Sequence, residues 1–119
     1  MCMINWNEVA MDAAKEAHEE RFERRRGAWY HEDLEVVVLF NNNPYVLHPE
    51  SRDKEVALFR AWLREVEFEE LGFAKYPVQT GYSYAMVIRA TKDDKELLED
   101  VMLAITIDCF PATQSQATA

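Results

Sequence analysis

The sequence predicts an α+β domain, with an antiparallel or mixed sheet of three to four strands packed with three helices. The first observation is the stretch 34–40 (Leu-Glu-Val-Val-Val-Leu-Phe), whose β-branched residues favour an extended backbone. Both faces of this stretch are apolar, which is typical of a strand inside a sheet that is covered from both sides. The second observation is that other stretches carry apolar residues at helical spacing. We therefore expect residues 34–40 to form a central strand with helices packed on it.

The first helix is expected to start after Asn5 and to run to residue 26. Asn5 is a preferred N-cap residue, and Glu8 stands three residues later, as in a capping box. Alanines at positions 10, 13, 14 and 17 form a narrow stripe that would let another element approach closely. Gly27 is predicted to end this helix, and residues 28–33 are predicted to link it to the central strand.

The central strand is expected to end in a turn at residues 41–44, and residues 45–48 could return as a short second strand. Pro49 suits the first position of a second helix, because its missing N–H costs nothing there. Val56, Phe59 and Leu63 define the apolar face of this helix. We expect it to span residues 49–71 and to stop at Gly72.

Two further strands are predicted at residues 73–78 and 82–90, and Pro77 places the first of them at a sheet edge. Thr91 and Asp94 resemble a capping box at the start of a third helix, which Pro111 closes. Residues 1–111 are thus expected to form a single domain, and residues 112–119 a disordered tail. From residue 34 on, the βαββα order loosely resembles a ferredoxin-like arrangement without its last strand, and this resemblance carries no function.

The composition indicates a globular, acidic protein. Hydrophobic residues make up 49% of the chain and charged residues 29%, and the formal net charge is -9. Residues 32–72 hold ten acidic and four basic residues. Such a surface repels nucleic acid and anionic membranes, so we expect no direct nucleic-acid or membrane binding, and a protein partner that is basic.

The sequence predicts a cytoplasmic protein. The first residues lack the basic and apolar regions of a secretory signal, and no apolar run approaches the length of a membrane helix. Cys2 and Cys109 lie near opposite ends of the chain, and their spacing matches no zinc or redox pattern. We therefore expect both thiols to be reduced.

No motif points to catalysis, a metal or a cofactor. The three histidines lack the helical spacing of a zinc site, and three glycines are too few for a phosphate-binding loop. Asp108 beside Cys109 would raise the pKa of that thiol, which is the opposite of what a reactive cysteine needs. These absences favour a non-enzymatic protein over an enzyme.

A cluster of glutamates offers a candidate partner-binding surface. We expect these residues at the C-terminal end of the second helix, where acidic side chains oppose the helix dipole, so local stability does not explain their placement. We include two tyrosines near the strands in the candidate partner-binding surface, because tyrosine is enriched in interface hot spots. The candidate residues are Glu65, Glu67, Glu69, Glu70, Tyr76 and Tyr82.

The leading functional hypothesis is a small acidic protein-binding module. In a sharper version it is an inhibitor that engages a basic, nucleic-acid-binding protein surface by charge mimicry, as small phage- or plasmid-encoded proteins do. One alternative is a small-ligand-binding domain or enzyme with a pocket lined by tyrosines and by His31 or His48. Another alternative is a structural subunit that self-associates, for example as a homodimer through a helix face or a sheet edge.

Overall fold

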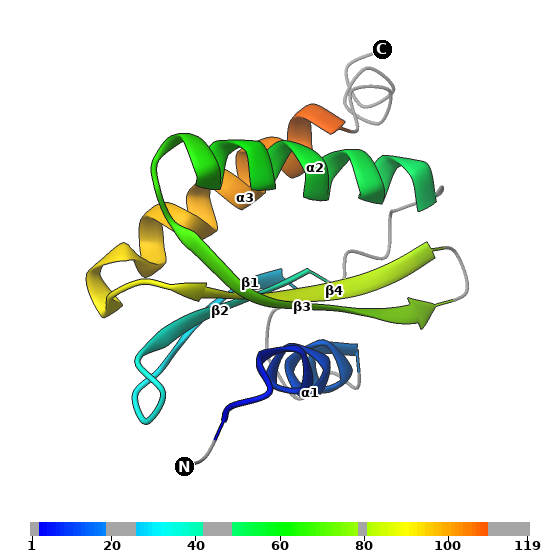
Figure 1. Cartoon of the computed structure of the whole chain (residues 1–119). Helices are drawn as coiled ribbons and strands as arrows, with labels where there is room; N and C mark the ends of the chain where they lie inside the picture. The colour runs from blue at the N-terminus through cyan, green and yellow to red at the C-terminus, as the bar shows by residue number, and fades with distance from the viewer. Residues whose placement is uncertain (1–2, 19–25, 42–48, 79–80, 110–119) are drawn as a thin grey trace.

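The computed structural model of the chain describes residues 3–18, 26–41, 49–78 and 81–109. Within these residues, four strands form one antiparallel sheet in the order β1-β2-β4-β3. Helix α1 covers one face of the sheet, and α2 and α3 cover the other (Figure 1). The elements are α1 (Trp6–His18), β1 (Arg26–His31), β2 (Val36–Asn41), α2 (Pro49–Glu65), β3 (Glu69–Val78), β4 (Gly81–Arg89), the 3-10 helix η1 (Lys92–Asp94) and α3 (Lys95–Cys109). The α+β prediction is confirmed, and the sheet is antiparallel throughout.

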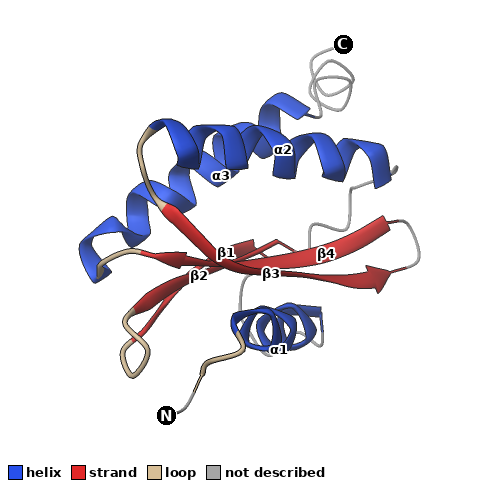
Figure 2. Ribbon diagram, viewed as in Figure 1, coloured by secondary structure: helices blue, strands red, loops and turns tan. Residues whose placement is uncertain are grey.

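The predicted central strand is β2, but it spans Val36–Asn41 instead of residues 34–40, because Leu34 and Glu35 lie in the turn that follows β1. Strand β2 lies between β1 and β4, and all of its residues are buried. Val37 and Leu39 belong to the core under α2 and α3, whereas Val36, Val38 and Phe40 belong to the core under α1. Its apolar character on both faces therefore has the predicted cause, since Figure 2 shows helices on both sides of the sheet.

The alanine stripe of α1 allows the close approach that its small side chains predict. Ala10, Ala13 and Ala14 are buried in one cluster with Ala85 and Val87 of β4. At the start of the helix the backbone comes closer still, to β3. A Cβ atom built at Gly72 would lie 2.5 Å from the backbone carbon and oxygen of Trp6.

From the central strand onward, the chain follows the predicted βαββα order as β2, α2, β3, β4 and α3. Strands β2 and β3 are each antiparallel to β4, which lies between them, so β2 and β3 run in the same direction. This is a split βαβ unit. The fourth strand, β1, comes from the N-terminal side and pairs with the free edge of β2.

That fourth strand corrects one prediction. Residues 28–31, expected as a linker, pair with β2 from Ala28↔Leu39 to His31↔Val36, and Gly27 lies within the strand instead of ending a helix. Trp29 and Tyr30 favour strand over linker because aromatic residues fit a pleated surface.

Four predicted features lie outside the described residues: helix at 19–25, the turn and possible strand at 42–48, the turn at 79–80, and the tail at 112–119.

The end of α2 corrects a second prediction. The helix ends at Glu65, not at residue 71, and β3 has already begun at Glu69. The last turn closes through two backbone hydrogen bonds, from Glu67 N–H to the Arg64 carbonyl (3.2 Å) and from Phe68 N–H to the Leu63 carbonyl (2.9 Å). This is a Schellman motif in which Glu67, with φ of 65°, occupies the left-handed position that usually holds glycine.

Gly72, the expected helix stop, lies instead inside β3, next to a β-bulge between Glu70 and Gly72. Pairing of β3 with β4 and the close approach of Trp6 account for the glycine there.

The helix starts were predicted correctly. Asn5 Oδ1 accepts a hydrogen bond from Glu8 N–H, and the Asp94 carboxylate accepts hydrogen bonds from the Thr91 N–H and hydroxyl.

Candidate functional site

Three connections meet at one end of the sheet, seen at the left of Figure 1: the β1–β2 turn, the α2–β3 connection and the β4–η1 connection. We call this region, residues 32–35, 64–69 and 89–96, the acidic end. It holds nine acidic and four basic residues, so it carries more than half of the chain's net charge of -9. The antiparallel order produces this gathering, because β1 and β4 end where β2 and β3 begin.

The acidic end is open to solvent. Eight of its nine acidic side chains are exposed, and the ninth, Asp94, is the partly exposed cap of η1. Glu69 pairs with Arg89 at 3.0 Å, but both side chains are more than 60% exposed, and pairs of this kind contribute little. Val66 is an exposed apolar side chain of this region (44% exposed), and Leu97, which directly follows the region's last residue, Glu96, is also exposed (49%). The region and its border therefore combine a negative surface with exposed apolar side chains.

The structure divides the predicted glutamate cluster. Glu65, Glu67 and Glu69 lie in the acidic end, but only Glu65 belongs to α2. The premise that all four acids oppose a helix dipole is therefore wrong, since Glu69 and Glu70 begin β3. Glu70 faces α2, where it accepts two hydrogen bonds from Arg60, from Nε and Nη2, each 2.8 Å long.

The two predicted tyrosines lie on opposite faces of the sheet. Tyr76 is partly buried against the α1 core, and Tyr82 belongs to the core under α2 and α3. The Tyr82 hydroxyl donates a hydrogen bond to Asp53 of α2. Burial and the Asp53 carboxylate raise the pKa of Tyr82, and the Tyr82 hydrogen bond lowers the pKa of Asp53. Neither tyrosine is part of the acidic end.

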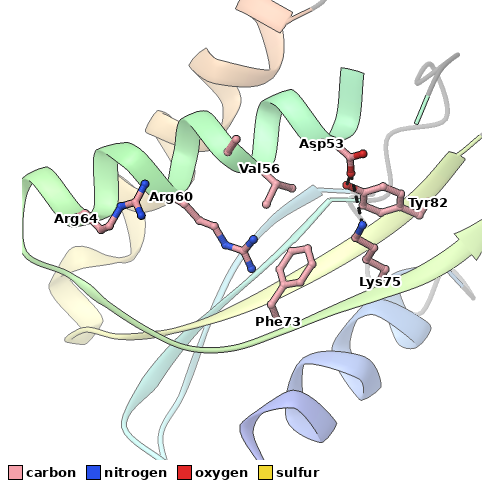
Figure 3. A pocket seen from close by; sticks show the side chains of 8 residues that line it. Asp53, Val56, Arg60, Arg64, Phe73, Lys75 and Tyr82 are labelled. Atoms are coloured by element: carbon pink, nitrogen blue, oxygen red, sulfur yellow. Dashed lines mark hydrogen bonds and ion pairs between the residues drawn. The ribbon is translucent and has the colours of Figure 1, made fainter. Parts of the chain in front are cut away.

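A pocket of about 300 Å³ opens between α2 and the edge strand β3 (Figure 3). It brings together Arg60 and Arg64 from α2 with Phe73 and Lys75 from β3, and a single acidic residue lines it. The lining residues are Asp53, Val56, Ala57, Arg60, Arg64, Phe73, Lys75 and Tyr82. Sequence reasoning placed Tyr82 in a candidate site but missed the three cations, because Lys75 is far from the arginines in sequence.

No histidine is among the described residues that line this pocket. His31 lies at the end of β1, the opposite edge strand, where its Nδ1 accepts a hydrogen bond from Leu34 N–H (3.2 Å) and its ring lies against Trp29. His48 falls outside the described residues. Of the expected tyrosine and histidine lining, the structure places Tyr82 at the pocket.

A fully buried polar network joins α2, β2, β4 and α3. The Glu55 carboxylate accepts from Arg52 (3.1 Å), Asn41 (2.9 Å) and the Tyr84 hydroxyl (2.9 Å), all to Oε1, and Thr106 Oγ1 lies 3.1 Å from Oε2. Arg52 also donates to the backbone carbonyl of residue 82. Burial first, and then the Glu55 charge, raises the pKa of Tyr84 well above its ordinary value. The network holds α2 against the sheet by satisfying every charge it buries.

Sequence reasoning missed this network although a signal existed. The apolar stripe of α2 (Val56, Phe59, Leu63) continues toward the N-terminus to Arg52 and Glu55, which are 1% and 0% exposed. Helical spacing was therefore the signal that could have identified two buried charges facing the sheet. The sequence predicts a turn at Asn41, but this residue is the last of β2 and is buried.

Across the described residues, no group of three or more histidine, cysteine or acidic side chains could hold a metal ion. In that same part of the chain no helix is both long and apolar enough to cross a membrane. Comparisons with protein-family models, curated proteins and solved structures found no match to this chain.

Proposed function

We propose that the protein is a small acidic, non-enzymatic binding module whose acidic end engages a basic surface of a protein partner. The observation that carries this proposal is the meeting of three acidic connections at one end of the sheet, with nine acidic against four basic residues. These residues come from three separated segments of the chain. A random spread of the net charge would not concentrate more than half of it there.

The physical basis is electrostatic complementarity. Exposed carboxylates on a rigid frame attract a basic surface, speed its encounter and exclude acidic partners. Val66 and Leu97 can supply the desolvated contacts that hold the complex once it forms. In the sharper version the partner is a nucleic-acid-binding protein, because its binding surface already accepts a regular array of negative charges. The protein would then act in the cytoplasm as an inhibitor by charge mimicry.

Charge reversal with a matched control tests the proposal. The test variant is Glu65→Lys/Glu67→Lys, and the control is Glu8→Lys/Asp12→Lys on α1, where both acids are also exposed. Each protein would be immobilised, and binding of a set of purified nucleic-acid-binding proteins would be measured at low and high salt. We expect binding to fall with salt and to be lost in the test variant only. Equal loss in both variants, or salt-independent binding, would refute the electrostatic proposal.

Self-association is the second candidate. Strand β1 is a sheet edge, and it carries Trp29 with 40% of its surface exposed. Edge strands are ready templates for pairing with another chain. Light scattering over a range of protein concentrations tests a homodimer, and a monomer at every concentration would remove this candidate.

A further inference from the structure

We infer that the pocket between α2 and β3 binds a small aromatic anion, with one carboxylate or phosphate group attached to a single ring. The pocket adjoins the acidic end and shares Arg64 with it, but the inference does not depend on the function proposed above.

The charge of the pocket is the first argument. Arg60, Arg64 and Lys75 line it together with Asp53, so three cations face one carboxylate in a chain whose net charge is -9. Glu70, which pairs with Arg60, lines a second hollow of about 400 Å³ that shares Arg60 and Arg64 with the pocket. The residues that line this hollow are Arg60, Leu63, Arg64, Phe68 and Glu70. Even with Glu70 included, the site retains one excess positive charge.

The second argument is that two of the cations are held in place before any ligand arrives. The Arg60 guanidinium lies 4.5 Å from the centre of the Phe73 ring, and its Nε and Nη2 bind Glu70. Its Nη1 takes no part in that pair and can still donate. Lys75 Nζ lies 4.5 Å from the centre of the Tyr82 ring and 3.5 Å from Asp53. Binding an anion here therefore costs less side-chain entropy than ordering free lysines and arginines would.

Arg64 supplies the third cation. Among the described residues, no hydrogen bond or ion pair engages its exposed side chain, and it stands one helical turn after Arg60. Its charge is therefore available to a ligand. Guanidinium groups bind carboxylate and phosphate with paired hydrogen bonds, so this residue suits either anionic group.

The shape of the pocket adds the aromatic part of the ligand. Val56 and Phe73 offer apolar surface between the cations, as Figure 3 shows. The volume of about 300 Å³ is at the lower limit of small-molecule sites, which suits one ring and not a nucleotide. A ring resting on this surface would place its acidic substituent among the cations.

The test is an NMR titration of the isotope-labelled full chain with three probes: phenyl phosphate, benzoate and neutral benzamide. We expect both anions to give saturable shifts at the backbone amides of Arg60, Phe73 and Lys75, and benzamide to give none. The phosphate and carboxylate arms distinguish which anionic group the pocket prefers. No saturable shift with either anion, or equal shifts with benzamide, would overturn the inference.

Two variants complete the experiment. Arg64→Gln/Lys75→Gln removes two exposed cations and is expected to weaken anion binding by about tenfold or more, since each lost charge-assisted hydrogen bond is costly. Arg89→Gln, an exposed arginine in the acidic end, is the matched control and should bind as the wild type does. The spectra report folding at the same time. Equal weakening in both variants would show a general charge effect and would overturn the site.

Discussion

Arg60 on α2 donates two hydrogen bonds of 2.8 Å to Glu70 on β3, and this pair joins the helix to the edge of the sheet. The neighbouring residue, Glu69, points to the opposite side of β3 and meets Arg89, with both side chains largely exposed. Adjacent residues on a strand alternate between its faces. Two consecutive glutamates therefore have different roles, one in the structure and one in the solvent-facing acidic end.

Charge reversal separates these roles. We expect Glu70→Lys to lower the free energy of unfolding by about 1 kcal/mol or more, because it replaces a two-point ion pair with repulsion from Arg60. We expect Glu69→Lys to change it by no more than about 0.5 kcal/mol, as for most exposed substitutions. Urea denaturation of the two variants is the measurement. Equal effects would show that the Arg60–Glu70 pair contributes nothing to stability.

Glu67 provides a second prediction, because it holds a left-handed conformation (φ of 65°) at the end of α2. A side chain is strained there, whereas glycine is not. We expect Glu67→Gly to raise the free energy of unfolding by about 0.5–1 kcal/mol, measured by urea denaturation. As a control, Ala61→Gly, at an exposed position in the interior of α2, should be destabilising, since glycine is unfavourable in a helix. Destabilisation by Glu67→Gly would mean that the glutamate side chain stabilises the turn.

Local chemistry predicted much of the fold from the sequence. The β-branched run identified β2, and capping residues identified the starts of α1 and η1, because these signals act between near neighbours in the chain. The end of α2 escaped prediction since glutamate, not glycine, occupies the Schellman position at residue 67. Strand β1 escaped because the extended state of residues 26–31 depends on pairing with β2, and sequence periodicity does not report that pairing.

The candidate sites were less predictable than the fold. Glu65, Glu67 and Glu69 were found from sequence density alone, but the other acids of that region, at residues 32–35 and 93–96, join them only through strand order. The same holds for the pocket, where Lys75 meets Arg60 because β3 folds back under α2. Nothing in the local sequence specifies contacts between segments so far apart.

Gly72 and Ser83 give a third prediction, on the α1 side of the sheet. A methyl group at Gly72 would lie 2.5 Å from the Trp6 backbone, so Gly72→Ala must displace α1 and should cost about 1–3 kcal/mol. The buried Ser83 Oγ has no hydrogen-bond partner among the described residues, so Ser83→Ala should be neutral or stabilise by up to about 1 kcal/mol. Thermal unfolding monitored by circular dichroism compares the two. A neutral Gly72→Ala would contradict the close approach of α1.

The tyrosine pKa shifts lead to a fourth prediction, in alkali. The unfolded chain releases tyrosine protons near pH 10, whereas the fold raises the pKa of both Tyr82 and Tyr84. Above about pH 10 the folded state therefore binds more protons than the unfolded state, and stability falls as pH rises further. We expect the fall in urea midpoint between about pH 9 and about pH 11 to be smaller in Tyr82→Phe than in the wild type. If the urea midpoint of Tyr82→Phe fell as much as that of the wild type, Tyr82 would ionise equally in the folded and unfolded states.

The buried Arg52–Glu55 pair supports the last prediction. Arg52 neutralises a carboxylate that has no access to solvent, so Arg52→Met would leave that charge buried and uncompensated. Breaking such a pair is expected to cost about 3–5 kcal/mol. Arg64→Met, which removes an exposed arginine from the same helix, should cost no more than about 0.5 kcal/mol and serves as the control.

The double variant Arg52→Met/Glu55→Gln distinguishes charge burial from lost packing. It removes both charges and keeps an amide oxygen that can accept from Asn41 or Tyr84. We expect it to be less destabilised than Arg52→Met alone, because no ion is left unpaired in the core. Urea denaturation of the four proteins at neutral pH gives the comparison. If the double variant were the less stable, the network would act mainly through the hydrogen bonds that the Glu55 carboxylate accepts. If Arg52→Met matched Arg64→Met, the buried Arg52–Glu55 pair would contribute nothing to stability.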